Sequence, residues 1–487
     1  MWTEIANHSS SPISHTGRDR VVSSFVGGLP EVSVDVGAVP HQRARNFPLY
    51  RTVSRFVRDP LQELLRIGAA ADGEVARLDL GASRPFLVTH PDHVQQVLRR
   101  ESDNFLRDGV FWRPMRELMG DSILAEGPEW EHSKRVLQPV FTTRNVNRLT
   151  ELMAEAINDA VDKLDEPARA GDTIDVLPEM SRIVNETVIK VLFGDKISPV
   201  EANRLIPTFD QVATTISFRF LLPFVPRVVP LPGDRTFKNG VQIMDEVLFE
   251  LVKRYRDDPG DGSDIFTALC QAPTEDGNPP DAKWIRDNLL AMFATSTETT
   301  TLALTWLWPL LHDHPDVTAR LVAEIDGVVG GGRVRPEHLP ELPYVSQVVQ
   351  ELLRLYPVGW MFPRMATKPT TIGGVPIKPG DPVLISPFLT HRLTSVWDRP
   401  LEFDPERFTR ENSHGRHRYA YFPFGGGPHQ CIGRHVFNVE AQMILASILS
   451  RFRPALSEAA PAMPRIGATL RPRKSLKLTL TPASKEG

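Results

Sequence analysis

The sequence has little cysteine, no long hydrophobic run and no strong excess of either charge. Two cysteines in 487 residues exclude a disulfide framework and a four-cysteine metal cage. No window of about 18 uninterrupted apolar residues occurs, so we expect no transmembrane anchor. The net charge of −4 arises from mixed signs and gives no basic face for nucleic acid. We therefore expect a cytoplasmic globular protein that does not bind nucleic acid.

The spacing of apolar residues predicts a mainly α domain with a minor β region. Residues 1–45 have no periodicity and are interpreted as a flexible N-terminal extension before a single domain over residues 46–487. Pro309 is expected to end the helix in which it lies, and Pro357 is expected to end the helix that precedes it. Helices are predicted over residues 92–99, 150–164, 285–310, 344–355 and 433–452, a hairpin over residues 74–90, and short strands over residues 370–385.

One cysteine lies in a glycine-rich loop directly before an amphipathic helix. The loop reads FGGGPHQCIG over residues 424–433. Amide groups at the start of the helix and the positive end of its dipole favour Cys431 in its thiolate form. The glycines let a flat ligand approach the backbone, so the loop suits thiolate ligation of a haem iron.

Taken by themselves, these residues leave other interpretations of Cys431 open. A lone cysteine is most often a small buried hydrophobe. A catalytic thiol would need a histidine partner, which no spacing rule identifies here. A phosphate-binding loop would need the G-x-G-x-x-G pattern, which is absent. A zinc site would need more ligands, and Cys270 is far upstream.

The same loop resembles the haem-binding loop of the cytochrome P450 family, whose pattern is F-x-x-G-x-x-x-C-x-G. Phe424, Gly427, Cys431 and Gly433 match every fixed position of that pattern. The resemblance implies a haem-thiolate monooxygenase of the bacterial type, with the single-domain P450 fold from about residue 45. It also implies haem b as cofactor, Cys431 as the axial ligand of its iron, and Phe424 in the haem-binding loop.

A carboxylate and two arginines resemble the network that supports this loop in the family. Glu351 and Arg354 lie on one face of a predicted helix, where they can pair. The segment P-E-R-F places Arg407 where the family has the second arginine. The alternative is a solvated surface pair worth about 0.3–0.5 kcal/mol.

The longest predicted helix contains the polar segment ATSTETT over residues 294–300. Its simplest interpretation is a polar helix face whose threonines bond back to the helix. It also resembles the family's A/G-G-x-D/E-T-T groove, which implies that Glu298 and Thr299 relay protons to bound dioxygen. Ser296 stands where glycine is usual.

Several cations and one tryptophan resemble the family's contacts to the haem propionates. Trp130 and Lys134 match a W-x-x-x-R helix in which lysine replaces arginine and loses the planar fork. Arg364 and His429 match two further propionate positions. Each residue alone is also typical of an ordinary surface position.

Apolar residues near the predicted site indicate that the substrate is a bulky, hydrophobic small molecule. Such stripes are also typical of a core. We expect a terpenoid first and a macrolide or other polyketide second, as in secondary-metabolite or antibiotic biosynthesis. The candidate pocket residues are Phe111, Trp112, Met115, Trp360, Met361 and Phe362, with residues 216–229 as a further apolar segment.

The resemblance also implies the source of electrons. Residues 432–487 are too few for a fused reductase, so NAD(P)H-derived electrons are expected to arrive through a ferredoxin and a ferredoxin reductase. Peroxide-dependent or non-oxidative relatives often lose the acid–alcohol pair, which Glu298 and Thr299 retain. A haem-based binding or sensor protein is the alternative outside enzymes, and the sequence shows no appended signalling domain.

Overall fold

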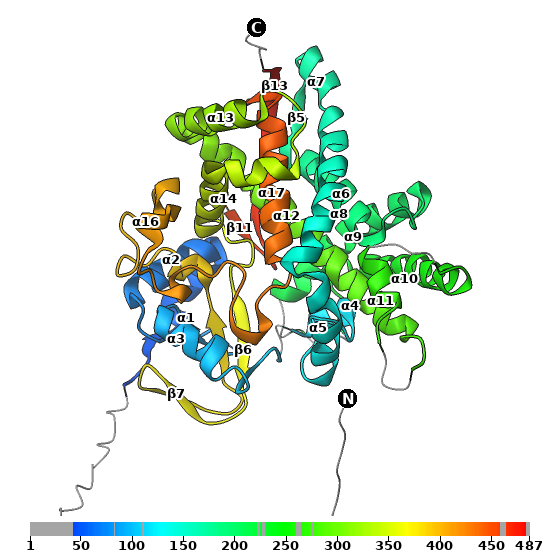
Figure 1. Cartoon of the computed structure of the whole chain (residues 1–487). Coiled ribbons are helices and arrows are strands. Elements are labelled where there is room, and N and C mark those ends of the chain that lie inside the picture. The colour runs from blue at the N-terminus through cyan, green and yellow to red at the C-terminus, as the bar shows by residue number, and fades with distance from the viewer. Residues whose placement is uncertain are drawn as a thin grey trace, which may run out of the picture. The chain divides into compact units, whose positions relative to one another are not determined.

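The computed structural model describes residues 42–483 except 82, 110–111, 222–224, 226–228, 260–263, 274–276 and 458–463. The described part is mainly helical with small sheets, which confirms the predicted fold class (Figure 1). The expected flexible extension lies almost wholly outside the described residues, so it stays a prediction.

Helices make up most of the described chain and follow the predicted periodicity. The α-helices are α1 (Leu49–Arg58), α2 (Pro60–Ala71), α3 (Pro91–Gln95), α4 (Arg113–Met119), α5 (Pro128–Val140), α6 (Thr143–Asp162), α7 (Asp165–Ala170), α8 (Val176–Phe193), α9 (Pro199–Leu221), α10 (Asp234–Asp257), α11 (Ile265–Cys270), α12 (Ala282–Asp313), α13 (Pro315–Val329), α14 (Pro343–Leu355), α15 (Pro387–Thr390), α16 (Arg410–Ser413) and α17 (Arg434–Leu449). A π-helix, η1 (Gln96–Arg100), and the 3-10 turns η2 (Pro336–Glu341), η3 (Pro405–Phe408), η4 (Arg418–Ala420) and η5 (Gly427–His429) complete the set.

The strands form one larger sheet and three small ones. The larger sheet has the order β1 (Arg45–Phe47), β2 (Ala76–Leu78), β3 (Phe86–Val88), β9 (Pro382–Ile385), β6 (Phe362–Ala366) and β4 (Phe105–Leu106). The small sheets are β10 (Phe452–Leu456), β13 (Lys477–Pro482) and β5 (Thr173–Asp175); β11 (Pro464–Ile466) and β12 (Leu470–Pro472); and β7 (Thr370–Ile372) and β8 (Val375–Ile377). The antiparallel β2–β3 pair confirms the predicted hairpin.

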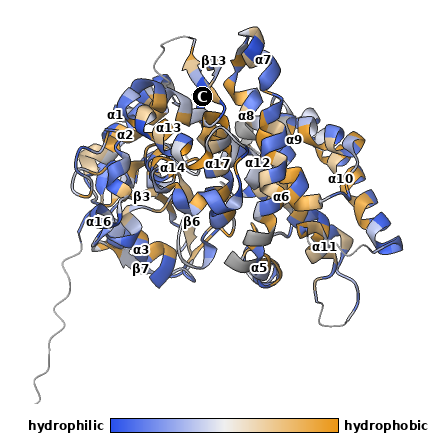
Figure 2. Ribbon diagram, turned by 45° about the horizontal axis from the view of Figure 1, so that its top comes forward, coloured by the Kyte–Doolittle hydropathy of each residue, from blue (hydrophilic) through white to orange (hydrophobic). Residues whose placement is uncertain are grey.

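The long helix α12 organises the core of the described unit. It packs against α8, α10, α14 and α17, and α12 and α17 lie in the middle of Figure 1. Its start is capped by Asp281, whose carboxylate accepts the Trp284 N–H at 3.2 Å. Along the outer helices α9 and α10, hydrophobic and hydrophilic residues alternate, as expected for amphipathic helices (Figure 2).

The prediction that Pro309 ends this helix is wrong. Helix α12 continues through Pro309 to Asp313. Proline removes one N–H donor, but the neighbouring residues Trp306, Leu307, Leu310 and Leu311 are all buried. Burial of these large side chains on both sides of the proline offsets the lost hydrogen bond. In contrast, α14 ends at Leu355, before Pro357, as predicted.

Candidate active site

The cysteine loop is held against η1 by a contact that only glycine allows. Gly427 has a φ of +68°, and a Cβ atom there would lie 1.7 Å from the carbonyl oxygen of Leu98. The Cys431 N–H donates to the carbonyl of Phe424 at 2.9 Å and closes the loop. These contacts fix the direction in which the chain enters α17.

The Cys431 thiol lies at the start of α17, among protein atoms but open to solvent on one side. Burial raises the pKa of this thiol, while the backbone amides of Gly433 and Arg434 hydrogen-bond the sulfur and lower the pKa by a smaller amount. The loop therefore supplies donors to a thiolate, but full ionisation of the sulfur needs a cation next to it. Iron in a haem group provides such a cation.

Glu351 and Arg354 form a fully buried ion pair on α14. The Arg354 Nε and Nη2 atoms donate to the two carboxylate oxygens of Glu351 at 2.7 and 2.8 Å. The remaining guanidinium hydrogens bond the carbonyls of His391, Pro400 and Glu402. Burial raises the pKa of Glu351, although Arg354 acts against that shift. A buried charge with all its partners is stable, whereas removing one partner costs several kcal/mol.

Arg407 lies beside this pair and ties it to the segment before the cysteine loop. Its Nε atom is 3.5 Å from a Glu351 oxygen, and its Nη atoms donate to the carbonyls of Asp398 and Arg399 at 2.5 and 2.8 Å. The structure thus brings together the three residues that the sequence predicted to form one network.

Two arginines and a histidine surround the Glu126 carboxylate near the loop. Arg107 and Arg364 are buried and His429 is half-buried; the Glu126 carboxylate is 2.9 Å from His429 Nε2 and 3.6 Å from Arg107 Nε. Burial and then Arg107 lower the pKa of Arg364 to about 9. Burial also lowers the pKa of Arg107 to about 10. Burial opposes ionisation of Glu126, yet its bonds to His429 and the Arg107 amide bring its pKa down to about 2.

This cluster has more positive charge than its own residues neutralise. The Nε atom of Arg107 is buried and has no hydrogen-bond partner in the described part of the chain. Guanidinium groups remain charged at neutral pH, so a second anion would relieve the cost of burying them. The two propionates of a haem group have the required charge, and the residues present fit that group.

Trp130 and Lys134 lie on α5, next to this cluster. The Trp130 ring contacts His429 at a tilt of 40° with ring centroids 4.2 Å apart, and Lys134 Nζ is 4.7 Å from the Trp130 ring centroid. Lys134 Nζ also donates to the carbonyl of Pro428 at 2.9 Å. Lysine therefore links α5 to the cysteine loop directly, although it lacks the fork of an arginine.

The middle of α12 is open although the helix is buried on either side. Its buried residues run from Ile285 to Ala294 and again from Thr300 to Leu311, and Thr297 is buried between the two runs. Between them, Thr295 is exposed, and Ser296, Glu298 and Thr299 are half-buried. The predicted acid and alcohol both lie in this segment.

Glu298 and Thr299 have separate hydrogen-bond partners. The Thr299 hydroxyl donates to the Thr295 carbonyl at 2.5 Å. The Glu298 Oε1 atom accepts from Thr469 Oγ1 and from Arg471 Nη2, both at 2.7 Å. These last two residues belong to the C-terminal β11–β12 hairpin, which the sequence did not predict.

The candidate substrate residues divide between different surroundings. The indole N–H of Trp112 donates to the Pro363 carbonyl at 3.0 Å, and its ring lies 5.8 and 5.9 Å from the guanidinium carbons of Arg107 and Arg364. Trp112 is thus next to the cation cluster. Met115, on α4, packs against the main core. Phe111 lies outside the described residues, as do most side chains of residues 216–229.

The residues after α14 lie near both the cysteine loop and the C-terminal hairpin. Phe362 is next to the loop, since a Cβ atom on Gly425 would lie 3.7 Å from its ring. Trp360 and Met361 pack with Leu470 and the half-buried Ile466 of the hairpin. These three aromatic and sulfur-containing side chains therefore connect the two segments.

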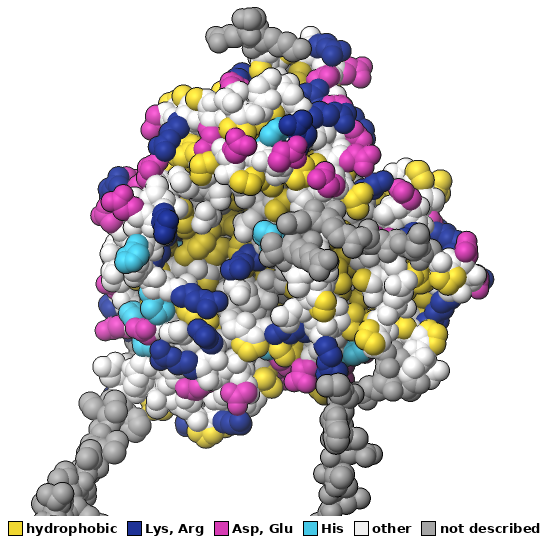
Figure 3. Space-filling view, in the orientation of Figure 1, with side chains coloured by type: hydrophobic (Ala, Val, Ile, Leu, Met, Phe, Trp, Pro, Cys, Tyr) yellow, Lys and Arg dark blue, Asp and Glu magenta, His cyan; other side chains and the backbone are white. Residues whose placement is uncertain are grey.

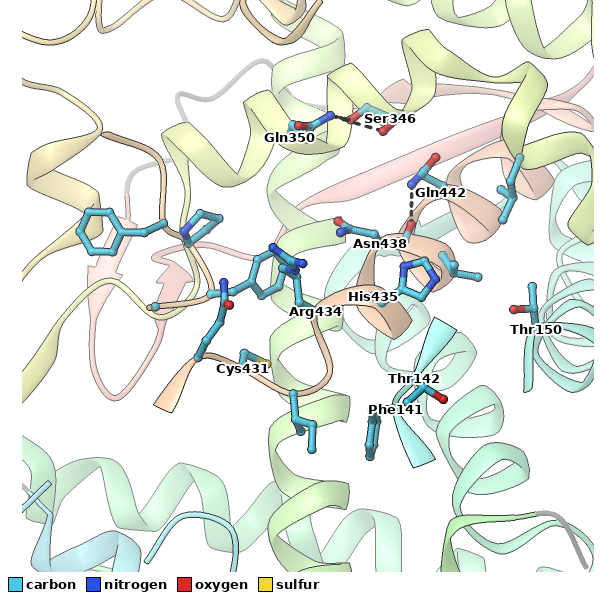
Figure 4. Close-up of a pocket in the computed structure, with 18 of the residues that line it drawn as sticks. Phe141, Thr142, Thr150, Ser346, Gln350, Cys431, Arg434, His435, Asn438 and Gln442 are labelled. Carbon is cyan, nitrogen blue, oxygen red and sulfur yellow. Dashed lines mark hydrogen bonds between the residues drawn. The ribbon is translucent and has the colours of Figure 1, made fainter. Parts of the chain in front are cut away.

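A cavity of about 1350 Å³ opens next to the cysteine loop. Cys431, Arg434, His435 and Asn438 line it together with Phe141 and Thr142 at the α5–α6 junction (Figure 4). Figure 3 shows a hollow with hydrophobic side chains and a rim bearing Lys and Arg on the face drawn. The lining lacks Glu298 and Thr299, so this cavity does not include the middle of α12.

The loop around Cys431 and the mostly helical fold suit a haem-thiolate protein, and comparison with known sequences shows that the chain belongs to the cytochrome P450 family. The family model described as Cytochrome P450 matches residues 43–480. The resemblance and the predicted enzyme class, a P450 monooxygenase, are confirmed. Membership implies haem and O2-dependent chemistry. Among the described residues, no helix is long and apolar enough to cross a membrane.

Similar proteins come from Streptomyces. The chain is 28% identical to the pentalenene oxygenase of Streptomyces avermitilis, over 88% of this chain and 94% of that protein. It is 31% identical to the cyclooctatin synthase of Streptomyces melanosporofaciens, over 89% and 92% of the two chains. Among solved structures, the haem domain of cytochrome P450DA matches with a TM-score of 0.81 at 21% identity and covers 92% of this chain and 99% of that one. The last comparison supports the fold alone.

The sequence missed two sets of site residues. Arg107 and Glu126 carry no motif that marks them, and only their burial next to His429 reveals them. Thr469 and Arg471 occur in a short segment with prolines and a glycine, which gives a weak strand signal. The only available indication was the carboxylate of Glu298, which has no oppositely charged residue within four positions along its own helix.

Proposed function

We propose that this P450 inserts one oxygen atom from O2 into a C–H bond of a bulky hydrophobic metabolite, a terpenoid first and a polyketide second. The Cys431 thiol, with donor amides from Gly433 and Arg434, is the observation that carries the oxidative chemistry. The relatives named for pentalenene and cyclooctatin act on terpenoids, which supports the first substrate class.

Haem bound at this loop would supply the redox-active iron that activates O2. Cys431 would provide the sulfur ligand, and the amides at the start of α17 would stabilise its negative charge. Arg107, Arg364 and His429 are the residues that would hold the propionates, with Trp130 and Lys134 beside them. Glu351, Arg354 and Arg407 keep the loop in place behind the ligand.

The residues in the middle of α12 handle protons. Thr299 holds a hydroxyl proton at Oγ1, and Glu298 is the neighbouring group that exchanges protons with water. Ser296 adds a hydroxyl where the family usually has glycine. The buried residues on both sides of this segment limit the amount of water that reaches it.

We assign the electron supply to a ferredoxin and a ferredoxin reductase that use NAD(P)H in the cytoplasm. The cavity beside Cys431 supports this assignment, since Arg418, Arg434 and His435 line it. These side chains complement an acidic electron carrier, and complementary charge accelerates encounter. The presence of Glu151 and Glu337 on the same lining limits the net positive charge.

A binding screen tests the substrate class. A ligand that displaces water from haem iron changes its spin state, and this change shifts the absorption spectrum. We expect pentalenene and related polycyclic terpenoids to produce a saturable shift, and polyketide macrolides a smaller one. Polar sugars serve as the negative control. A shift with macrolides alone would contradict the terpenoid assignment, and a shift with sugars would contradict the hydrophobic pocket.

A further inference from the structure

The acid of the proton-handling pair is attached to a hairpin distant in sequence. One oxygen of the Glu298 carboxylate accepts hydrogen bonds from Arg471 Nη2 and from Thr469 Oγ1, each at 2.7 Å. Both side chains of the ion pair are largely shielded, with 25% of Arg471 and 20% of Glu298 exposed. Charge-assisted bonds in partial shielding are stronger than surface pairs. Glu298 is therefore held by the hairpin in this conformation.

The hairpin has two different faces. Thr469 and Arg471 are two positions apart, so their side chains point to one face, towards α12. Leu470 points to the other face and is fully buried with Leu61 and Phe388. One face is thus anchored in the core, and the other presents a hydroxyl and a guanidinium to Glu298.

Two indoles tie the hairpin to the rest of the site. Trp306, on α12, donates its N–H to the Leu470 carbonyl at 3.0 Å. Trp360, a candidate pocket residue, donates its N–H to the Gly467 carbonyl in the turn at 3.1 Å. The Trp360 ring is thus hydrogen-bonded to the turn that carries Thr469.

We propose that Arg471 is a positioning residue which, with Thr469, restrains the Glu298 carboxylate on the C-terminal hairpin until a hydrophobic substrate displaces the hairpin through Trp360. This inference rests on the proposed monooxygenase function. Glu298 and Thr299 share no hydrogen bond in the described structure, so Glu298 serves the alcohol only after its bonds to the hairpin loosen. The restraint limits electron consumption in the absence of substrate.

The test measures NAD(P)H oxidation without substrate, using a ferredoxin and its reductase, in H2O and in D2O. We expect Arg471→Ala to raise this rate about ten-fold or more, the factor that corresponds to loss of one charge-assisted hydrogen bond. The solvent isotope effect should fall, because proton exchange by Glu298 becomes easier. Arg471→Lys, which keeps a cation, should remain near the wild-type rate.

The controls use the same hairpin and the same acid. Arg465 is exposed and lies directly opposite Arg471 in the strand pair, so Arg465→Ala should leave the rate unchanged. Trp360→Phe removes the N–H donor but keeps an aromatic ring, and it should raise the rate in the same direction as Arg471→Ala. In a Glu298→Gln background, neither substitution should have an effect.

Equal effects of Arg471→Ala in the wild-type and Glu298→Gln backgrounds would overturn the inference, and so would an unchanged rate with Glu298 intact. The carbon monoxide spectrum of each reduced variant is recorded first. A wild-type protein without the signature of thiolate-ligated haem would overturn the proposed function itself, and the inference with it. Normal spectra with additive rates would overturn the inference alone.

Discussion

At the scale of residues, the site combines groups whose charges are unfavourable without a ligand. Burial raises the pKa of the Cys431 thiol, and Arg107 and Arg364 are buried around a single carboxylate. A haem group would compensate both charges, because its iron is a cation next to the sulfur and its propionates are anions that can pair with the guanidiniums. The iron and the propionates would thus stabilise groups of opposite charge, the thiolate and the buried arginines.

A buried carboxyl beside the site predicts an unusual dependence of stability on pH. Burial raises the pKa of Glu440 from its ordinary 4.5 to about 8, and the Thr300 hydroxyl, 2.9 Å away, lowers it by less. Between these values the unfolded chain releases the proton that the folded chain retains, so stability falls as pH rises. Glu440→Gln, which is neutral throughout, should flatten this fall and raise the free energy of unfolding near pH 7 by up to ~3 kcal/mol.

Denaturant unfolding of both proteins at about pH 5 and about pH 7 measures this difference. The two proteins should diverge as pH rises. A parallel pH dependence in Glu440→Gln and the wild type would show that Glu440 does not keep its proton in the fold.

The Thr299 hydroxyl predicts a specific functional loss. Thr299→Ala removes the proton held at Oγ1 in the open segment of α12, so electrons should be consumed with less product and more hydrogen peroxide. A loss of coupling of about ten-fold or more is expected. Thr301→Ala is the matched control, since this threonine is buried on the same helix. Unchanged coupling in Thr299→Ala would indicate a different proton route.

At the scale of elements, most of the fold could be predicted because its helices are long and periodic. Helix α14, the β2–β3 hairpin and α17 agree with the sequence pattern. The continuation of α12 past Pro309 could not be predicted, because it depends on the burial of Trp306 and Leu310 by other elements. The pairing of Glu298 with the C-terminal hairpin is likewise a contact between distant segments, which local periodicity does not contain.

The cysteine loop gives a prediction about packing between elements. Gly427→Ala would place a Cβ atom 1.7 Å from the Leu98 carbonyl in a backbone with a φ of +68°. We expect loss of haem retention and a destabilisation of more than about 2 kcal/mol, from strain plus the clash. Gly415 has a similar φ of +76°, and no atom lies within 4 Å of a Cβ placed there. Gly415→Ala therefore measures the cost of backbone strain without a steric clash.

Thermal unfolding and haem content of the two variants provide the measurement. Gly427→Ala should lose haem, and Gly415→Ala should keep it. Equal haem content in both variants would contradict the close docking of the loop on η1.

At the scale of the whole molecule, the fold class followed from composition and periodicity, and the family from one loop supported by motifs in order. The substrate did not follow, since apolar residues such as Met115 are used equally for core packing. We propose that residues 46–487 form one domain. A chain that begins at residue 42 should bind haem as the full chain does, as measured by its absorption spectrum, and a loss of haem would assign the preceding residues a structural role.

Cys431 is proposed to supply the thiolate ligand of a haem iron. The most direct test is the absorption spectrum of the reduced, carbon monoxide-bound protein, compared with Cys431→Ala and with Cys270→Ala. Burial raises the pKa of Cys270 to about 12, so this second thiol stays protonated and serves as the control. We predict the long-wavelength band of thiolate-ligated haem in the wild type and in Cys270→Ala, and its absence in Cys431→Ala. Persistence of the band in Cys431→Ala would show that Cys431 is not the ligand of the iron.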